Sequence, residues 1–531
     1  MLSKKYKDFL DLVFYQIYPK SFKDSNGDGM GDLKGITEKI PYLKELGVTA
    51  VWLSPCYKTN NDDGGYDIYD YRDIQEDFGT LEDWKEMIRV MHENGIKLIM
   101  DYVANHTSTS HKWFQEGRKS KDNPYHDFYI WCDKPMNDWH SCFGGSVWEY
   151  NEPTNEYYLH SFCVSQADLN WDNPAVRREM IDIIDFWVDL GVDGFRCDVL
   201  DMISKELPYK NGHGPNLHKY INMIFGREKT KHLFTVGECY SEDPQFMIDV
   251  SAYDRKELST TFQFDIINVG RRWRFDPVPL DYGRFREIYS KWQKVAIDND
   301  LLYPTFMENH DQPRCVTLFG DDKNYRYESA TMLATLVYSL RGVPFIYQGQ
   351  EIGVTNSSFD DIKYFDDVET VGFYKENKDK YSHEEIMRRI NFGSRDNARH
   401  PMPWNGGENG GFGTGKPWLS LYPYYKDINV EDEMKRDKSV YRYFKEYFAM
   451  RKNNDILKYG DYEDITKDGQ CAYYAYKRTY EGKSLVIICN YNNETTVDID
   501  MSKLKKIFGN YNDDNGANMR KFECGIYEVI D

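Results

Sequence analysis

Short apolar runs recur along the chain, and segments whose apolar residues repeat with a helical period separate most of them. Such runs are typical of strands that are buried on both faces. The helical period is clearest over residues 81–94, 175–190 and 330–340, and the last of these is almost wholly apolar. Eight runs are predicted to be strands: Val13–Tyr18, Ala50–Leu53, Lys97–Asp101, Gly194–Asp198, Leu233–Gly237, Thr261–Phe264, Thr305–Glu308 and Pro344–Tyr347.

Strands that alternate with helices form a parallel sheet, and eight such units predict a closed (β/α)8 barrel of the α/β class, the TIM barrel. The connection after the third strand is much longer than the others and lacks a helical period, which indicates a small domain of its own. After about residue 455 the pattern changes to alternating strands, which is typical of an antiparallel sheet. We therefore expect barrel segments at 1–104 and 173–454, an inserted domain at 105–172, and a β-sandwich at 455–531.

Composition and net charge disfavour several classes of binding partner. A net charge of −20 disfavours nucleic acid and anionic membranes, which attract clustered Lys and Arg. The sequence contains no apolar stretch of transmembrane length, and the N-terminal residues lack the apolar core of a signal peptide. The ten cysteines follow no regular spacing, which favours reduced thiols. We expect a cytoplasmic monomer without a membrane or nucleic-acid partner and without an organic cofactor.

Polar residues gather where the predicted strands end. Four segments carry them: Asp101–His106, Gly194–Asp198, Gly237–Glu238 and Glu308–Asp311. In a barrel of this type, the carboxyl ends of the strands form one rim, and the active site lies there. Any one of these residues could instead cap a strand or a helix, but the set taken together favours an active site.

The four segments resemble, in their order along the chain, the conserved regions of the α-amylase superfamily, glycoside hydrolase family 13. Within it, the resemblance is to bacterial oligo-1,6-glucosidases and dextran glucosidases, and it runs through nearly the whole chain. It implies a retaining α-glucosidase that acts on short oligosaccharides. Asp198 would be the nucleophile, Glu238 the general acid and base, and Asp311 the third carboxylate. Arg196 would keep Asp198 ionised, and we expect a raised pKa at Glu238.

The resemblance also implies a pocket for one glucose unit. His106 and His310 resemble the pair that hydrogen-bonds the hydroxyls of that glucose, and Tyr66 resembles the ring that stacks on it. Asp63 and Arg399 are similar to the pair that clasps the 4-hydroxyl at the non-reducing end, which implies exo action. Arg399 is followed by His-Pro-Met-Pro where relatives usually have Thr-Pro-Met-Gln, so the neighbouring wall is expected to differ.

The preferred linkage depends on weaker signals. Gln166 begins a motif that resembles one typical of oligo-1,6-glucosidases, although Ala follows it where that group has Pro. Val199 is the residue type found in enzymes that prefer α-1,6 bonds, or it simply packs the end of a strand. Phe143 and Phe162 would form an aromatic wall on the acceptor side. The basic segment 268–274 is similar to one in sucrose isomerases, so sucrose and its isomers remain alternative substrates, as does trehalose 6-phosphate.

A non-enzymatic alternative is a catalytically inactive barrel of the same superfamily, which binds sugar or partners a transporter. Such barrels usually have a broken carboxylate set, whereas this chain retains all three carboxylates. The intact set favours an enzyme.

Residues 24–32 form a candidate metal loop with oxygen donors at alternate positions and a glycine for the tight turn. An EF-hand would need Glu at the twelfth position, where this chain has Gly35, so that motif is excluded. The loop instead resembles a Ca²⁺ loop after the first barrel strand of oligo-1,6-glucosidases; Mg²⁺ is the alternative ion, and a solvated turn the alternative structure. The implied ligands are the side chains of Asp24, Asn26, Asp28 and Asp32 and the carbonyl of Met30.

Overall fold

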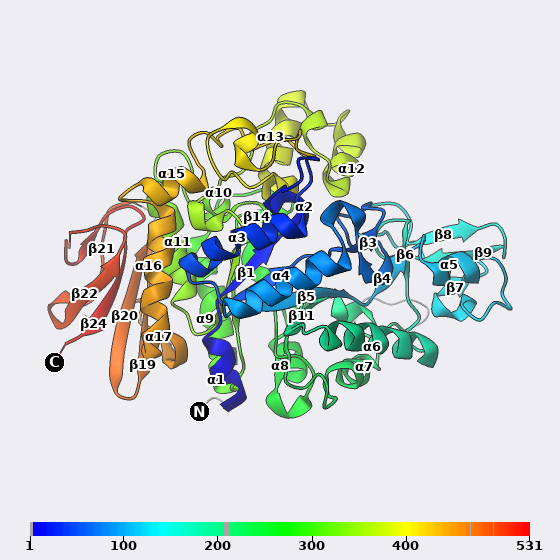
Figure 1. Cartoon of the computed structure of the whole chain (residues 1–531). Helices are drawn as coiled ribbons and strands as arrows, with labels where there is room; N and C mark the ends of the chain where they lie inside the picture. The colour runs from blue at the N-terminus through cyan, green and yellow to red at the C-terminus, as the bar shows by residue number, and fades with distance from the viewer. Residues whose placement is uncertain (1–3, 207–212, 468, 492, 514, 531) are drawn as a thin grey trace.

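Eight parallel strands form the centre of the molecule (Figure 1). The structure is a computed structural model that describes residues 4–206, 213–467, 469–491, 493–513 and 515–530. The predicted domain ranges 1–104, 173–454 and 455–531 each include some residues outside the described ones. The strand order is β13-β12-β11-β5-β2-β1-β17-β16. The strands are β1 (Phe14–Ile17), β2 (Ala50–Leu53), β5 (Lys97–Val103), β11 (Gly194–Asp198), β12 (Phe234–Gly237), β13 (Thr260–Thr261), β16 (Pro304–Thr305) and β17 (Val343–Tyr347).

Four of these strands, β1, β12, β13 and β16, are shorter than the sequence predicts. The predicted strands Thr261–Phe264 and Thr305–Glu308 are reduced to two residues each, and each strand starts one residue earlier. Near the ends of these two strands, side chains form hydrogen bonds with backbone groups. The Gln263 side-chain amide donates to the Thr261 carbonyl, and the Glu308 carboxylate accepts from the backbone amide of Cys315. Between β13 and β16 the Thr260 hydroxyl donates to the Leu302 carbonyl at 2.9 Å, so the barrel is nearly closed.

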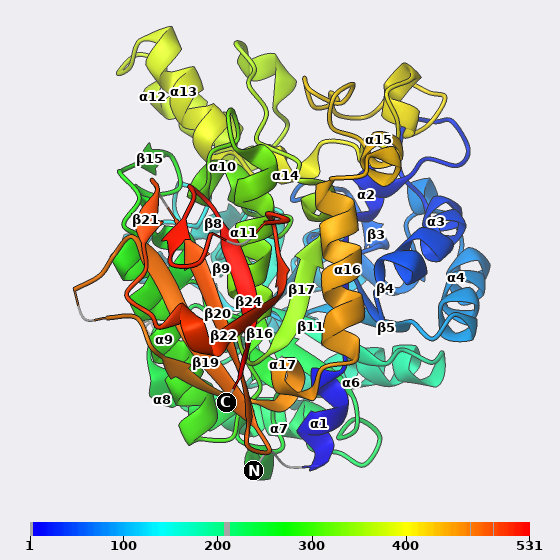
Figure 2. The same cartoon turned by 90° about the vertical axis from the view of Figure 1, so that its left-hand side faces the viewer.

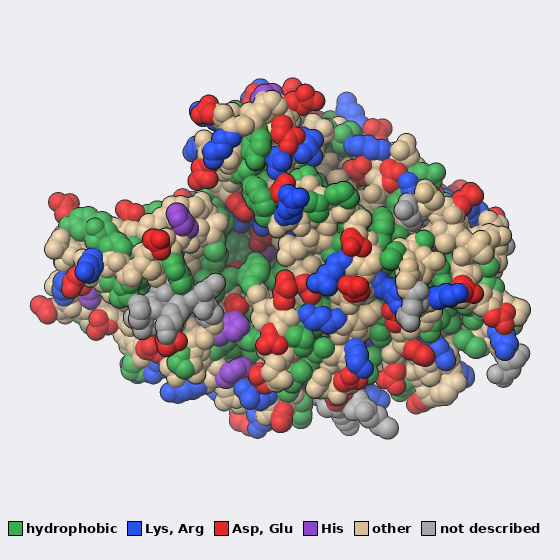
Figure 3. All heavy atoms as spheres, turned by 180° about the vertical axis from the view of Figure 1, so that it is seen from behind, with side chains coloured by type: hydrophobic (Ala, Val, Ile, Leu, Met, Phe, Trp, Pro, Cys, Tyr) green, Lys and Arg blue, Asp and Glu red, His purple; other side chains and the backbone are tan. Residues whose placement is uncertain are grey.

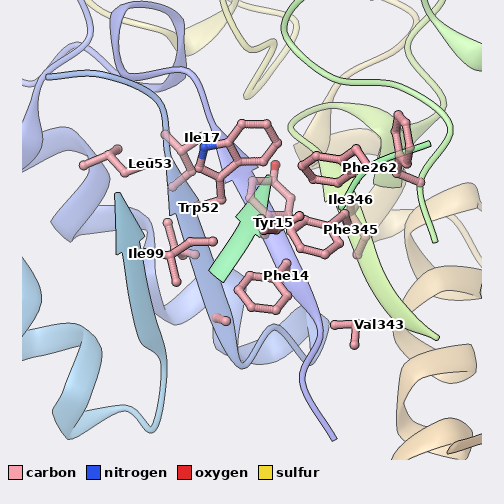
Figure 4. Packing of buried hydrophobic residues seen from close by; sticks show 14 of the residues in the cluster. Phe14, Tyr15, Ile17, Trp52, Leu53, Ile99, Phe262, Val343, Phe345 and Ile346 are labelled. Atoms are coloured by element: carbon pink, nitrogen blue, oxygen red, sulfur yellow. The ribbon is translucent and has the colours of Figure 1, made fainter. Parts of the chain in front are cut away.

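Aromatic rings fill the barrel interior (Figure 4). Phe14 and Phe345 come from neighbouring strands and stack with ring centroids 4.5 Å apart. Trp52 packs on Phe262 at 5.7 Å, and all four rings are buried. Strands with helices outside and large side chains inside are buried on both faces, which is why they read as continuous apolar runs.

Helices cover the outside of the barrel (Figure 1). The predicted helices at 81–94 and 175–190 correspond to α4 (Leu81–Glu93) and α6 (Pro174–Asp189). The third, α11 (Arg326–Tyr338), begins earlier than predicted, with a polar first turn. From Ser329 onward every residue of α11 is buried, because the C-terminal sheet packs against it: the Tyr476 hydroxyl donates to the Leu336 carbonyl.

The long connection after β5 folds into a lobe beside the barrel (Figure 1). Its strands are β6 (His106–Ser108), β7 (Trp131–Cys132), β8 (Trp148–Asn151), β9 (Glu156–Leu159) and β10 (Gln166–Asp168). The order β7-β9-β8 forms one antiparallel sheet, and β6 pairs with β10. A small apolar cluster that includes Ile130, Val147 and Leu159 supports the lobe.

The C-terminal segment forms an antiparallel sheet (Figure 2). Its order is β18-β19-β20-β24-β22, and a short pair, β21 with β23, lies beside it. The sheet buries one face against α11 and α16 (Val440–Lys452), as Tyr443 of α16 contacts Thr335 and Cys524. The strands are β18 (Asp461–Asp464), β19 (Tyr473–Tyr480), β20 (Lys483–Asn490), β21 (Thr495–Thr496), β22 (Leu504–Gly509), β23 (Asn518–Met519) and β24 (Cys524–Val529).

A second lobe follows β17 and lies at the top of Figure 1. It contains α12 (Val368–Asn377), α13 (His383–Gly393) and the short α14 (Asp396–Arg399). Phe275 and Phe373 stack at 4.4 Å and anchor this lobe to the segment after β13. Within the described part of the chain, we find no helix with the length and apolar character needed to span a membrane.

Candidate active site

The carboxyl ends of β5, β11 and β12 bring three acidic side chains together. Arg196 lies opposite Asp101 in the β11–β5 ladder, and Asp198 follows two residues later on the same face of β11. Glu238 comes directly after β12. All four side chains are buried. The strand register therefore places three carboxyl groups around one guanidinium.

Arg196 contacts all three carboxyl groups. Its Nη1 lies 2.5 Å from Oδ1 of Asp101 and 2.8 Å from Oδ1 of Asp198, and its Nη2 contacts Oε2 of Glu238. The sequence did not predict Asp101 as a site residue, although it lies in one of the four polar segments. Asp101 also accepts from Trp52 Nε1, and burial raises its pKa to about 6.

The sequence predicted that Arg196 would pair with Asp198 and hold it ionised, and its ionisation stays a prediction. The pairing is present, but burial raises the pKa of Asp198 well above its usual value, and the charges of Glu238 and Asp101 act in the same direction. One guanidinium does not compensate three buried carboxylates. The buried Asp198 carboxyl group therefore binds a proton more tightly than an exposed aspartate does.

His310 lies at the centre of a second group, in the loop after β16. Burial lowers its pKa to about 3, so the ring is neutral at ordinary pH. Its Nδ1 accepts from Gln16 Nε2 at 2.8 Å, which leaves its proton on Nε2. That nitrogen lies 2.8 Å from the Tyr66 hydroxyl and 3.2 Å from Oδ2 of Asp311. The Tyr66 ring stacks on His310 at 5.4 Å.

Two arginines hold Asp311: Arg399 lies in α14, and Arg395 directly precedes that helix. Arg399 Nη2 lies 2.5 Å and Arg395 Nη1 3.4 Å from Oδ1 of Asp311. Burial opposes ionisation, but His310 and these guanidiniums hold the pKa of Asp311 well below its usual range. Asp311 is therefore an anion at ordinary pH.

Asp63 contacts a different arginine from the one with which the sequence grouped it. Arg395 Nη2 lies 3.2 Å from Oδ1 of Asp63 and 2.7 Å from Oδ1 of Asp367, while Arg399 faces Asp311. The joint role of Asp63 and Arg399 on a substrate hydroxyl stays a prediction. Sequence reasoning missed Arg395 because its partners come from distant segments, and its nearness to Arg399 was the available signal. A small cavity of about 30 Å³ is lined by Asp63, Asp367, Arg395 and Arg399, among others.

The inserted lobe supplies the opposite wall. Gln166 Nε2 donates to Oδ2 of Asp63 at 3.2 Å and lies 3.1 Å from His106 Nε2. The β6–β10 ladder holds both side chains, and burial lowers the pKa of His106. The Phe162 ring lies 5.3 Å from His106 and 5.9 Å from Phe143. Figure 3 shows the surface hollowed between this lobe and the α12–α13 lobe.

A larger cavity lies elsewhere. It measures about 720 Å³ and lies against α1 (Lys4–Leu10) and α8 (Pro244–Ser251), lined by Tyr6, Phe9 and Tyr253 among others. None of the residues predicted to act on substrate lines it. We place the active site at the charged rim because the buried acid–base groups are gathered there.

Val199 has a strained backbone directly after Asp198. Its φ of 33° and ψ of 44° lie in the left-handed region, which β-branched residues avoid at a cost of about 1–3 kcal/mol. The next amide, of Leu200, donates to the Glu238 carbonyl at 3.2 Å. The turn therefore links the chain after Asp198 to the chain at Glu238.

The candidate metal loop is held by its own hydrogen bonds. Asp24 accepts from the amides of Asn26, Gly27 and Gly29, and Asp32 caps α3 (Leu33–Leu46) by accepting from the amide of Gly35. Asp28 accepts from the amide of Met30. Among the residues that the structure describes, no three or more His, Cys, Asp or Glu side chains are grouped so as to hold a metal ion. The Ca²⁺ site stays a prediction.

Three further side chains contact Glu238 or the chain next to Asp311, and of these Tyr240 was not noted in the sequence. The Tyr240 hydroxyl donates to Oε1 of Glu238 at 2.9 Å. Arg274 Nη1 donates to the Asp311 carbonyl at 2.6 Å, and Arg271 Nη2 donates to Oε1 of Gln312 at 2.9 Å. The basic segment was noted in the sequence, but its contact with the chain at Asp311 depends on the path after β13.

Comparisons with known proteins agree on one family. Residues 16–460 match the family model described as alpha amylase, catalytic domain. The chain is 45% identical to an oligo-1,6-glucosidase of Parageobacillus thermoglucosidasius over 98% of both chains. Two solved structures are similar throughout. Trehalose-6-phosphate hydrolase of Bacillus licheniformis matches with a TM-score of 0.94 and 38% identity, covering 98% of this chain and 100% of that one. Isomaltulose synthase of Erwinia rhapontici, solved with sucrose, matches with a TM-score of 0.93 and 37% identity, covering 98% and 99%.

Proposed function

This chain belongs to the α-amylase family of glycoside hydrolases, and from that premise we propose that it is a retaining, exo-acting α-glucosidase that cleaves α-1,6 bonds of isomaltose and isomalto-oligosaccharides. The observation that carries the proposal is the set of three acidic groups around Arg196 beside the neutral His310. Two of these acids supply the nucleophile and the proton donor that retaining glycoside hydrolysis needs.

The proposed reaction has two displacements. In the first, Asp198 attacks the anomeric carbon while the bond to the leaving oxygen breaks and Glu238 gives that oxygen its proton. In the second, Glu238 takes a proton from water, the water oxygen bonds to the anomeric carbon, and Asp198 leaves. The first step requires an ionised Asp198 and a proton on Glu238, and Arg196 contacts both carboxyl groups.

The surrounding groups fit one glucose unit. Tyr66 offers a ring face, and the neutral His310 can donate from Nε2 to a sugar hydroxyl. Asp311 remains anionic beside the reacting carbon, where it favours a cationic transition state. Beyond them, Asp63 and Arg395 close the pocket with an ion pair, which supports exo action.

The α-1,6 preference rests on the named oligo-1,6-glucosidase relatives and on Val199, whose buried side chain follows the nucleophile. The test measures kcat/KM for glucose release from isomaltose, maltose and sucrose. We expect isomaltose to lead by about tenfold, or about 1.4 kcal/mol of transition-state preference. A lead by sucrose would overturn the linkage, and an Asp198→Asn variant with near-normal turnover would overturn the mechanism.

A second candidate is hydrolysis of a phosphorylated disaccharide such as trehalose 6-phosphate, favoured by Arg271. This guanidinium is buried, and no carboxylate among the described residues lies within ion-pair distance of it; burial lowers its pKa to about 9. An uncompensated cation near the cleft favours an anionic substrate. The test compares trehalose 6-phosphate with trehalose. Arg271→Gln should reduce that preference, whereas the control Arg272→Gln, on a mostly exposed side chain, should not.

We further propose that residues 24–32 bind Ca²⁺. The loop offers carboxylate, amide and carbonyl oxygens, the donors that Ca²⁺ prefers, and their present hydrogen bonds leave lone pairs for an ion. Asp24, Asn26, Asp28, Asp32 and the Met30 carbonyl would hold it. The ion would stabilise the turn between β1 and α3. A monomeric state and a cytoplasmic location stay predictions.

A further inference from the structure

Tyr240 lies on the loop after β12, two residues beyond Glu238, and its side chain is 60% exposed. Its hydroxyl donates to Oε1 of Glu238 at 2.9 Å. Its ring stacks on Phe264, with centroids 4.9 Å apart and planes at 20°. Two contacts therefore fix the orientation of an exposed side chain that would otherwise sample several rotamers.

The backbone of Tyr240 is also fixed. Its amide donates to Oδ2 of Asp201 at 3.0 Å, and His213 Nε2 lies 3.2 Å from the same oxygen. The loops after β11 and β12 are joined a second time where the Leu200 amide donates to the Glu238 carbonyl. Tyr240 is thus held in register with both candidate catalytic carboxylates.

The two oxygens of Glu238 have different neighbours. Oε2 contacts Nη2 of Arg196, and Oε1 contacts the hydroxyl of Tyr240. A guanidinium donates hydrogen bonds and accepts none, so a proton on Oε2 would meet another donor. The proton of Glu238 therefore belongs on Oε1. A phenol hydroxyl suits that place, because it accepts from a protonated Oε1 and donates to an ionised one.

We propose that Tyr240 is a positioning residue for the acid–base group, a role that rests on the proposed function. The phenol accepts a hydrogen bond from the protonated Oε1 and so keeps the proton on the oxygen that does not face Arg196, from which it can pass to the leaving-group oxygen. When the glycosidic bond breaks, that proton passes from Oε1 to the leaving oxygen, and the Tyr240 hydroxyl turns to donate to the new carboxylate. Tyr240 itself gains and loses no proton.

The experiment is Tyr240→Phe, which keeps the ring stack on Phe264 and removes the hydroxyl. kcat/KM is measured with isomaltose, whose leaving alcohol needs protonation, and with 4-nitrophenyl α-glucoside, whose phenolate leaves without it. We expect a fall of about 10- to 100-fold with isomaltose and less than about threefold with the aryl glucoside, since general acid catalysis contributes about 10²–10⁴-fold. Tyr150→Phe, on an exposed tyrosine of the inserted lobe, is the matched control.

A merely structural tyrosine would lower both activities by the same factor, and that result would overturn the proposal, as would no change with either substrate. Glu238→Gln should show the same dependence on the leaving group, with larger losses. If the wild-type protein cleaves neither glucoside, the proposed function fails and this role with it. If the wild type cleaves both glucosides but Tyr240→Phe does not lower the activity on isomaltose more than that on the aryl glucoside, the role of Tyr240 is refuted and the proposed function stands.

Discussion

Replacing Arg196 with Gln removes the cation shared by the three buried carboxyl groups. In the native site, the guanidinium opposes burial and the charges of Glu238 and Asp101, all of which raise the pKa of Asp198. Without it, the pKa of Asp198 rises further, so this proposed nucleophile is protonated up to a higher pH. The acidic limb of the pH–rate profile should therefore move to higher pH.

The size of the effect follows from the ion-pair geometry. Nη1 of Arg196 lies 2.8 Å from Oδ1 of Asp198. The charge centres are then about 4 Å apart, where a pair contributes about 4 kcal/mol at an effective dielectric constant of about 20. Since about 1.4 kcal/mol is a factor of ten, kcat/KM at pH 7 should fall by about 100- to 1,000-fold.

The assay measures kcat/KM for 4-nitrophenyl α-glucoside between about pH 5 and pH 9. Arg196→Lys keeps a positive charge, so its acidic limb should move less than that of Arg196→Gln. Arg389→Gln, which removes a guanidinium from the ion pairs with Glu385 and Asp276, is the control and should leave the profile unchanged. A Gln variant that loses activity equally at every pH would show that Arg196 acts through geometry, and the electrostatic reasoning would be refuted.

Three further predictions concern stability. Chelation with EDTA should lower the Tm by several degrees, and added Ca²⁺ should restore it. An unchanged Tm would contradict the proposal that residues 24–32 bind Ca²⁺. Val199→Gly should be more stable than Val199→Ala by about 0.5–1 kcal/mol in urea unfolding, because glycine adopts a φ of 33° without strain; the reverse order would contradict the strain. Burial lowers the pKa of His111 from 6.5 to about 3. Below pH 6.5 the unfolded chain therefore binds a proton that the folded chain does not bind, and the free energy of unfolding falls as the pH approaches 3. His111→Asn, which can still cap α5 (Lys112–Gly117), should remove about 2 kcal/mol of this loss between pH 7.5 and pH 5 in urea unfolding; an equal loss in both proteins would contradict the assignment.

The sequence determined the barrel, because each long strand and helix is recognisable from local periodicity. Strands β2 and β11 have the predicted bounds, and α4 differs by one residue. The sequence likewise placed Asp198, Glu238 and Asp311 at or just beyond the ends of predicted strands, where the structure has them. Such features are local: the order of apolar and polar residues fixes the element, and the element fixes which end carries the side chain.

Tertiary structure alone decided which charges meet. Asp101, Arg395 and Tyr240 contact partners that lie on other strands and loops. The sequence therefore contains these residues but does not show which groups they meet. It also decided that Asp198 has a raised pKa, since that direction depends on how many carboxylates share one guanidinium at what depth of burial. Periodicity is set by neighbours along the chain, whereas electrostatic balance is set by distances through space, and only the folded chain fixes those.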